Sequence, residues 1–205
     1  MKLLFATGNE RKYKLMVERM RPLDNIEIIM PKNIGIKIDV NENGKSPEEN
    51  AIIKAKAYYD VANMPVIAED SGLYIDEFTP DEQPGMFVKR INGVEGLPDE
   101  EILRYYIDKL NGYGGKSMAH YETGVCLIDK NGNIYSDQIK ETPFLLTTKI
   151  DEASKGMSGG VLECISYDVN ANKYFAYQTK EDKDIFYKKL DNEYRELVRK
   201  HILWI

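Results

Sequence analysis

The chain has few cysteines, no long apolar run and no excess of positive charge, and each absence excludes a class of protein. Its two cysteines, Cys126 and Cys164, lie in apolar surroundings without Cys-x-x-Cys spacing, so neither a zinc site nor a disulfide framework is indicated. No segment approaches the ~18 uninterrupted apolar residues of a membrane span, and the apolar run in the opening MKLLFATGN is too short for a signal sequence. With 34 acidic against 28 basic residues, the chain lacks the clustered cations of a general nucleic-acid binder. We therefore expect a soluble cytoplasmic protein that binds neither nucleic acid nor membrane.

What is present predicts an α/β protein. The 205 residues, of which 42% are hydrophobic, suffice for one domain or for one domain with two lobes. Apolar periodicity and cap signals predict strands and helices in alternation. The predicted elements are a strand at 2–6, helices at 10–20, 47–62 and 97–112, a hairpin around Asn131 and Gly132, and a helix from Thr179 to about His201.

An acidic pair interrupts the third apolar segment. The β-branched and small residues of 66–68 predict the end of a buried strand, and Glu69, Asp70, Ser71 and Gly72 follow directly. Asp followed by Ser-Gly is ordinary turn chemistry. Ligands of open α/β sheets also bind outside the carboxyl ends of strands, where two carboxylates can hold Mg²⁺ or act as a base. Both interpretations stay open at this point.

The stretch ATGNERK places a glycine loop between the first strand and the first helix. This order suits phosphate binding by backbone amides and a helix N-terminus, although the spacing is not that of a P-loop. Arg11 and Lys12 fall in the first helical turn, where the macrodipole disfavours cations unless an anion compensates them. The alternative is that Asn9 simply caps the helix and the cations point into solvent.

The second helix begins with a capping box of Ser46, Pro47 and Glu49. Capping gives Glu49 a partner in the backbone of Ser46, so it need not have another role. Asn50 and Lys54 lie four residues apart and share one helical face with that carboxylate at its N-terminal end. This face is either solvated or part of a site. The later lysines of TKEDKDIFYKK have the same two interpretations.

Four motifs in register over residues 7–90 resemble the non-canonical purine nucleoside triphosphate pyrophosphatases, the enzymes that remove inosine and xanthosine triphosphates. TGNERK is similar to the family's T/S-G-N-x-x-K, EENAIIKAKA to its E-N-A-x-x-K-A, AEDSGL to its A-D-D-S-G-L, and PGMFVKR to its P-G-x-x-S-A-R. The resemblance implies a long mixed β-sheet flanked by helices, with two lobes and a central cleft, in a single domain spanning 1–205. It also implies a homodimer and Mg²⁺-dependent hydrolysis of a nucleoside triphosphate to monophosphate and pyrophosphate.

Carried over residue by residue, the resemblance makes Asp70 the general base and a metal ligand, with Glu49 as the second Mg²⁺ ligand. The substrate contacts that it implies are Thr7, Gly8, Asn9, Lys12, Lys54, Ser71 and Arg90. Asp70 would take the proton of the attacking water, while Mg²⁺ and the lysines neutralise the phosphates.

The C-terminal half departs from the family pattern. YFAYQTKEDKDIFYKK resembles T-F-A-E-L-x-x-E-E-K-N-x-x-S-H-R, so that Lys183 matches a substrate-binding lysine and Lys188 and Lys189 stand among the replacements of Ser-His-Arg. The family's G-F-G-Y-D-P has no clean counterpart in SGGVLECISYD. These two motifs hold the purine base, so triphosphate chemistry is implied more firmly than inosine specificity. The alternatives are a pyrophosphatase for another modified or pyrimidine nucleotide, and a nucleotide-binding regulator without turnover.

Overall fold

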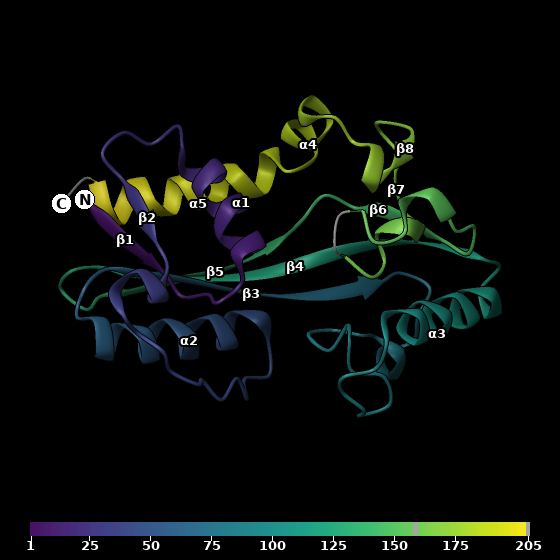
Figure 1. Cartoon of the computed structure of the whole chain (residues 1–205), viewed down its shortest axis with the longest axis horizontal. Helices are drawn as coiled ribbons and strands as arrows, with labels where there is room; N and C mark the ends of the chain where they lie inside the picture. Colours follow the sequence, from purple (N-terminus) through teal and green to yellow (C-terminus); the bar gives the residue numbers. More distant parts are fainter. Residues whose placement is uncertain (158–159, 204–205) are drawn as a thin grey trace. The chain divides into compact units, whose positions relative to one another are not determined.

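A mixed β-sheet runs through the chain, and the computed structural model describes it over residues 1–157 and 160–203 (Figure 1). Within these residues the sheet has eight strands in the order β2-β1-β3-β4-β6-β7-β8, with β5 paired to β4. The strands are β1 (Lys2–Phe5), β2 (Glu27–Ile29), β3 (Val66–Ile75), β4 (Lys116–Ile128), β5 (Ile134–Lys140), β6 (Phe144–Thr147), β7 (Ser166–Asp168) and β8 (Lys173–Tyr174). The predicted mixed sheet with flanking helices is confirmed.

The α-helices of the described residues are α1 (Glu10–Met20), α2 (Pro47–Ala62), α3 (Asp99–Gly112), α4 (Lys180–Phe186) and α5 (Lys188–Val198). Short 3₁₀ segments occupy Pro31–Ile34, Pro80–Glu82, Glu152–Ser154, Glu163–Ile165 and Phe175–Tyr177, and a π-helical turn covers Arg199–Leu203. In the part of the chain that the structure describes, no helix has both the length and the apolar character needed to cross a membrane.

The first of two compact units contains Met1–Ser71, Glu122–Lys140 and the chain from Lys189 onward. Here β1 pairs in parallel with β2 and with β3. Helix α2 covers one face of these strands, and α1 and α5 lie on the opposite face (Figure 1). Ala51, Ala55 and Tyr58 of α2 pack with Leu4, Ala6, Val66, Ala68 and Cys126. Because side chains alternate along a strand, the intervening residues of β1 and β3 face α1 and α5.

The second unit contains Gly72–Tyr121 and Glu141–Lys188. Its core is built on α3, which buries Ile102, Leu103, Tyr106 and Leu110. These side chains pack with residues of β3, β4 and β6, among them Leu73, Ile75, Ala119, Phe144 and Leu146. Cys164 belongs to this core, as Cys126 belongs to the core of the first unit, and both thiols are free.

The N-terminus of α2 lies directly against β4 because residue 124 is a glycine. A Cβ at Gly124 would fall 2.1 Å from the Glu48 nitrogen and 2.2 Å from the Pro47 carbonyl carbon. Real Cβ atoms do not make such contacts with backbone, so any side chain at this position would push the helix start away. The first turn of α2, which carries Glu49 and Asn50, is thereby fixed against the sheet.

Two predicted boundaries are wrong. The strand expected to end at Ala68 continues as β3 through Glu69, Asp70 and Ser71 to Ile75, so these residues do not form a turn. Each of the three polar side chains has a protein partner, and β3 pairs on both sides, which allows them to lie inside a strand.

The second difference concerns the C-terminal helix, which was expected to be continuous. It ends at Phe186 and begins again at Lys188, with Tyr187 as the C-cap of α4. The helical period of the sequence predicts that Leu197 lies on one apolar stripe with Leu190 and Tyr194, but Val198 is the residue buried with them. The sequence predicts helix on both sides of the break. It does not predict that Tyr187 caps the first of the two helices.

Candidate active site

The loop between β1 and α1 is held by its own side chains. The Thr7 Oγ1 accepts a hydrogen bond from the Asn9 amide at 3.1 Å. The Asn9 Oδ1 accepts from the amides of Arg11 at 2.9 Å and Lys12 at 3.3 Å, and thus caps α1. A Cβ at Gly8 would meet nothing within 4 Å, so the backbone there is open to a ligand. Asn9 therefore caps α1, as one interpretation predicts, but the Lys12 ammonium lies 3.4 Å from Glu69 Oε1 and does not simply point into solvent.

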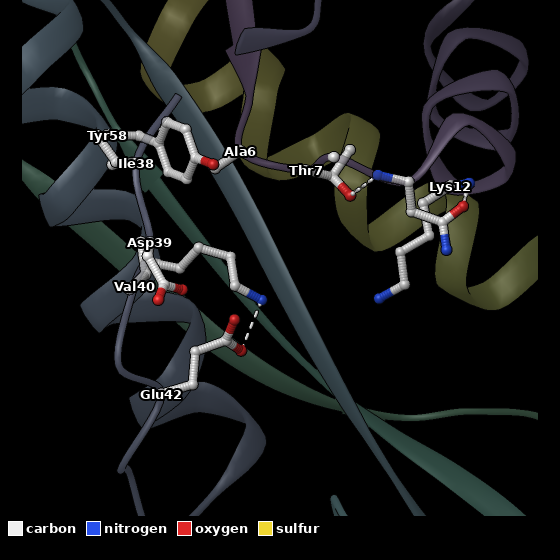
Figure 2. Close-up of a pocket in the computed structure, with 11 residues that line it drawn as sticks. Ala6, Thr7, Lys12, Ile38, Asp39, Val40, Glu42 and Tyr58 are labelled. Carbon is white, nitrogen blue, oxygen red and sulfur yellow. Dashed lines mark hydrogen bonds and ion pairs between the residues drawn. The ribbon is translucent and has the colours of Figure 1, made fainter. Parts of the chain in front are cut away.

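A polar pocket of about 310 Å³ opens beside this loop, at the carboxyl end of β1. Figure 2 shows Thr7 and Lys12 on one side of it, and Asp39 and Glu42 on the other. The lining residues are Ala6, Thr7, Gly8, Asn9, Lys12, Ile38, Asp39, Val40, Glu42, Lys54 and Tyr58. Two ammonium groups and two carboxylates in one pocket can bind an anion together with a cation.

Lys54 points into this pocket from α2 and is not solvated, since its side chain is only 14% exposed. Its Nζ lies 2.8 Å from Glu42 Oε2 and donates to the backbone carbonyl of Glu69 at 3.1 Å. The position of Lys54 is therefore fixed from both sides. The solvated interpretation of this helical face is wrong for Lys54.

Asp70 lies on β3 and faces α2. Its Oδ2 accepts a hydrogen bond from Asn50 Nδ2 at 2.8 Å, and Asn50 Oδ1 accepts from the Gly44 amide at 2.8 Å. The buried Asn50 thus orients the carboxylate and ties it to the segment that precedes α2. Ser71, the next residue, shares a hydrogen bond of 2.7 Å with Thr123 of β4.

Glu69 faces the opposite side of the sheet from Asp70, as strand alternation requires. Its Oε1 lies 3.4 Å from Lys12 Nζ, and its Oε2 accepts from the Tyr194 hydroxyl at 2.6 Å and lies 3.6 Å from Arg19 Nη1. Burial by itself would raise the pKa of the Glu69 carboxyl, but the charges of Lys12 and Arg19 and the Tyr194 hydrogen bond bring that pKa below its ordinary value. Glu69 is therefore ionised at neutral pH and is engaged by protein cations.

Glu49 does not complete the predicted capping box. Ser46 Oγ accepts from the Glu49 amide at 3.2 Å, as expected, but Glu49 Oε2 accepts from the amide of Lys45 at 2.7 Å, not from that of Ser46. The side chain is exposed and does not line the pocket. The expected partner is wrong because the chain before the N-cap folds back, which brings the preceding amide within reach.

Asp39 and Glu42 line the pocket and were missed by the sequence analysis. They lie in a segment without regular secondary structure, in which Ile36, Ile38 and Val40 pack against the core of the first unit. The alternation of these apolar residues is visible in the sequence and is the signal that indicates a segment fixed to the core.

The remaining predicted contacts lie outside this pocket. In the second unit, Arg90 forms an ion pair with Glu95 and stacks over Phe87, 4.2 Å from the ring centre, while Lys183 and Lys188 are exposed. Lys189 belongs to the first unit and donates to the Lys140 carbonyl at 2.7 Å. Of the stretch SGGVLECISYD, Ser158 and Gly159 lie outside the described residues.

The donor chemistry for a metal is present, although protein ligands alone do not enclose one. Within 1–157 and 160–203, no three His, Cys, Asp or Glu side chains are grouped closely enough to hold a metal ion. Mg²⁺ needs only one or two carboxylates when substrate phosphates complete its coordination sphere. Asp70, Glu42 and Glu49 are oxygen ligands of the type required.

Fold and pocket define an α/β protein with a charged site at the carboxyl end of its first strand. The chain belongs to the Ham1 family, whose model matches residues 3–185. The dITP/XTP pyrophosphatase of Treponema denticola is 34% identical to it over 186 residues, which cover 90% of each chain. The enzyme of the same name from Leptospira biflexa is 31% identical over 153 residues, or 75% of this chain and 74% of that one.

Solved structures of the family share the fold. The Staphylococcus aureus Ham1 protein superimposes with a TM-score of 0.76 at 22% identity, covering 98% of this chain and 99% of the other. A HAM1 protein from Coxiella burnetii gives a TM-score of 0.75 at 21% identity with the same coverage.

Proposed function

We propose that the chain is a metal-dependent nucleoside triphosphate pyrophosphatase that cleaves the α/β linkage and releases monophosphate and pyrophosphate. The observation that carries this proposal is the pocket in which Lys12 and Lys54 face Asp39 and Glu42 beside the strand that bears Asp70. Relatives that match most of the chain are named dITP/XTP pyrophosphatases, which supports a non-canonical purine triphosphate as substrate.

Asp70 is the proposed general base. The Asn50 amide holds one carboxylate oxygen, which fixes the orientation in which the carboxylate takes the proton of the attacking water. Lys12 and Lys54 neutralise phosphate oxygens from opposite sides of the pocket, aided by the open backbone at Gly8. The other proposed contacts to the substrate are Thr7, Asn9, Ser71, Arg90, Lys183, Lys188 and Lys189.

Membership of the family supports a divalent metal, and Mg²⁺ is the ion we assign. Asp70 supplies one carboxylate, and Glu49 and Glu42 are the two candidates for the second, with Glu42 favoured by its place in the pocket. Bound there, the ion would polarise the phosphate and neutralise its developing charge.

The proposal also retains the homodimer that the resemblance implies and a cytoplasmic location. Free, buried Cys126 and Cys164 suit a reducing compartment. A pyrophosphatase for another nucleotide remains the alternative within enzymes, because the motifs that hold the base in the family are altered here. A nucleotide-binding regulator is the alternative from another class.

The test is a panel of inosine, xanthosine, deoxyinosine, adenosine, guanosine and uridine triphosphates with Mg²⁺, scored for pyrophosphate and for phosphate. We expect pyrophosphate and monophosphate in equal amounts from at least one of them. Phosphate as the first product would contradict cleavage at the α/β linkage. Tight nucleotide binding without any product would identify the regulator.

A further inference from the structure

The Glu69 carboxylate links helix α5 to Lys12 in the first turn of α1. Tyr194 is fully buried on α5, and its hydroxyl donates to Glu69 Oε2 at 2.6 Å. The other oxygen of the same carboxylate, Oε1, lies 3.4 Å from the Lys12 ammonium. Lys12 lines the pocket, so Tyr194 is connected to a pocket cation through Glu69.

The aromatic ring of Tyr194 is itself held in place. The Arg19 guanidinium lies over it, 4.3 Å from the ring centre. Arg19 Nε is 2.8 Å from Asp191 Oδ1, one turn earlier on α5, and the Arg19 carbonyl accepts from Arg195 Nε at 2.7 Å. Helices α1 and α5 therefore fix the Tyr194 hydroxyl in one direction, toward Glu69.

The two oxygens of Glu69 have separate functions. Oε2 receives the Tyr194 hydroxyl and faces Arg19. Oε1 is thereby directed at Lys12, whose side chain is still 38% exposed and can reach an anion in the pocket.

We propose that Tyr194 is a positioning residue, which acts through Glu69 to hold the Lys12 ammonium where the pocket receives phosphate. This inference rests on the proposed function for the identity of the anion. Tyr194 lies beyond residue 185, the last residue that the family model matches.

The experiment is a double-mutant cycle of Tyr194→Phe and Lys12→Ala in the full chain. Phenylalanine keeps the ring under Arg19 and removes only the hydroxyl. Two quantities are measured, the Kd of inorganic pyrophosphate by calorimetry in Mg²⁺ and the separate kcat and KM for the best triphosphate of the panel. We expect Tyr194→Phe to raise Kd and KM by about three- to tenfold and to change kcat less, because residues in one network couple on this scale. In the Lys12→Ala background the same substitution should change Kd by less than about twofold.

Tyr106→Phe is the matched control, because it also removes a buried tyrosine hydroxyl, which donates to the Val88 carbonyl at 3.0 Å in the second unit. It should change the melting temperature without coupling to Lys12. If Tyr194→Phe does not fold, Glu69→Gln takes its place in the cycle, because the amide loses the charge that attracts Lys12. Equal effects in both Lys12 backgrounds would overturn the proposal. Coupling in pyrophosphate binding without turnover of any triphosphate would support the positioning role and reject the proposed activity.

Discussion

At the scale of single residues, Asp70 gives the sharpest test of the mechanism. Asp70→Asn should lower kcat by about 10² to 10⁴, the usual cost of losing a positioned base. The amide oxygen fills the same volume and can still accept from Asn50, so the melting temperature should stay near that of the unmodified chain. Steady-state rates and thermal unfolding of the same preparation measure both effects. Activity within a few fold of the original would remove Asp70 from this role.

Two glutamates compete for the second metal-binding position, and parallel substitutions distinguish them. Glu42→Gln should raise the Mg²⁺ concentration for half-maximal rate by at least about tenfold, since even residues behind a metal ligand cost this much. Glu49→Gln should raise it less and leave the melting temperature unchanged, because its amide oxygen can still accept from the Lys45 amide. Mg²⁺ titrations of the two variants decide the question. The opposite order would assign the position to Glu49.

At the scale of elements, the contact between α2 and β4 fixes the position of Asn50, which orients Asp70. Gly124→Ala should destabilise the protein by about 1–3 kcal/mol, the range typical of overpacking, because the new Cβ meets backbone. Activity should fall as well, since Asn50 moves with the start of α2 and releases Asp70. Gly112→Ala in α3 is the control, as its Cβ would meet nothing within 4 Å. Denaturant unfolding should show a lower midpoint for the first variant and no loss for the second.

Sequence patterns predict some of these elements well and others poorly, for physical reasons. Helix α2 begins where predicted because Ser46 and Pro47 act locally. Strand β3 extends further than predicted because Asp70 and Glu69 are satisfied by Asn50 and Tyr194, which lie far away in the sequence. The sequence predicts that Lys54 shares a face of α2 with Asn50, because that spacing is local. It does not predict the ion pair of Lys54 with Glu42, because that contact depends on the tertiary fold.

At the scale of the whole molecule, we expect base selectivity to depend on the residues that differ from the family pattern. A site that hydrogen-bonds a purine carbonyl rejects the amino analogue because its donors are left unpaired. Lysines at 188 and 189 carry flexible point charges and do not reproduce a planar guanidinium or an imidazole. We expect the ratio of kcat/KM for inosine over adenosine triphosphate to stay below roughly a hundredfold, the modest end of enzyme discrimination. Competition assays in one Mg²⁺ buffer measure this ratio, and a much larger value would mean that other residues rebuild the purine site.

Because both native cysteines are buried, labels can be attached selectively to cysteines introduced on the surface. Burial raises the pKa of Cys126 to about 12, and it raises the pKa of Cys164 as well, so burial disfavours the maleimide-reactive thiolate at both positions. The unmodified chain should therefore take up no label until it is unfolded, which mass spectrometry can check. Cysteines introduced at Val61, 55% exposed in the first unit, and at Ile185, 63% exposed in the second, would then be the sole sites of attachment. A pair of spin labels at these positions would report the distance between the two units with and without nucleotide.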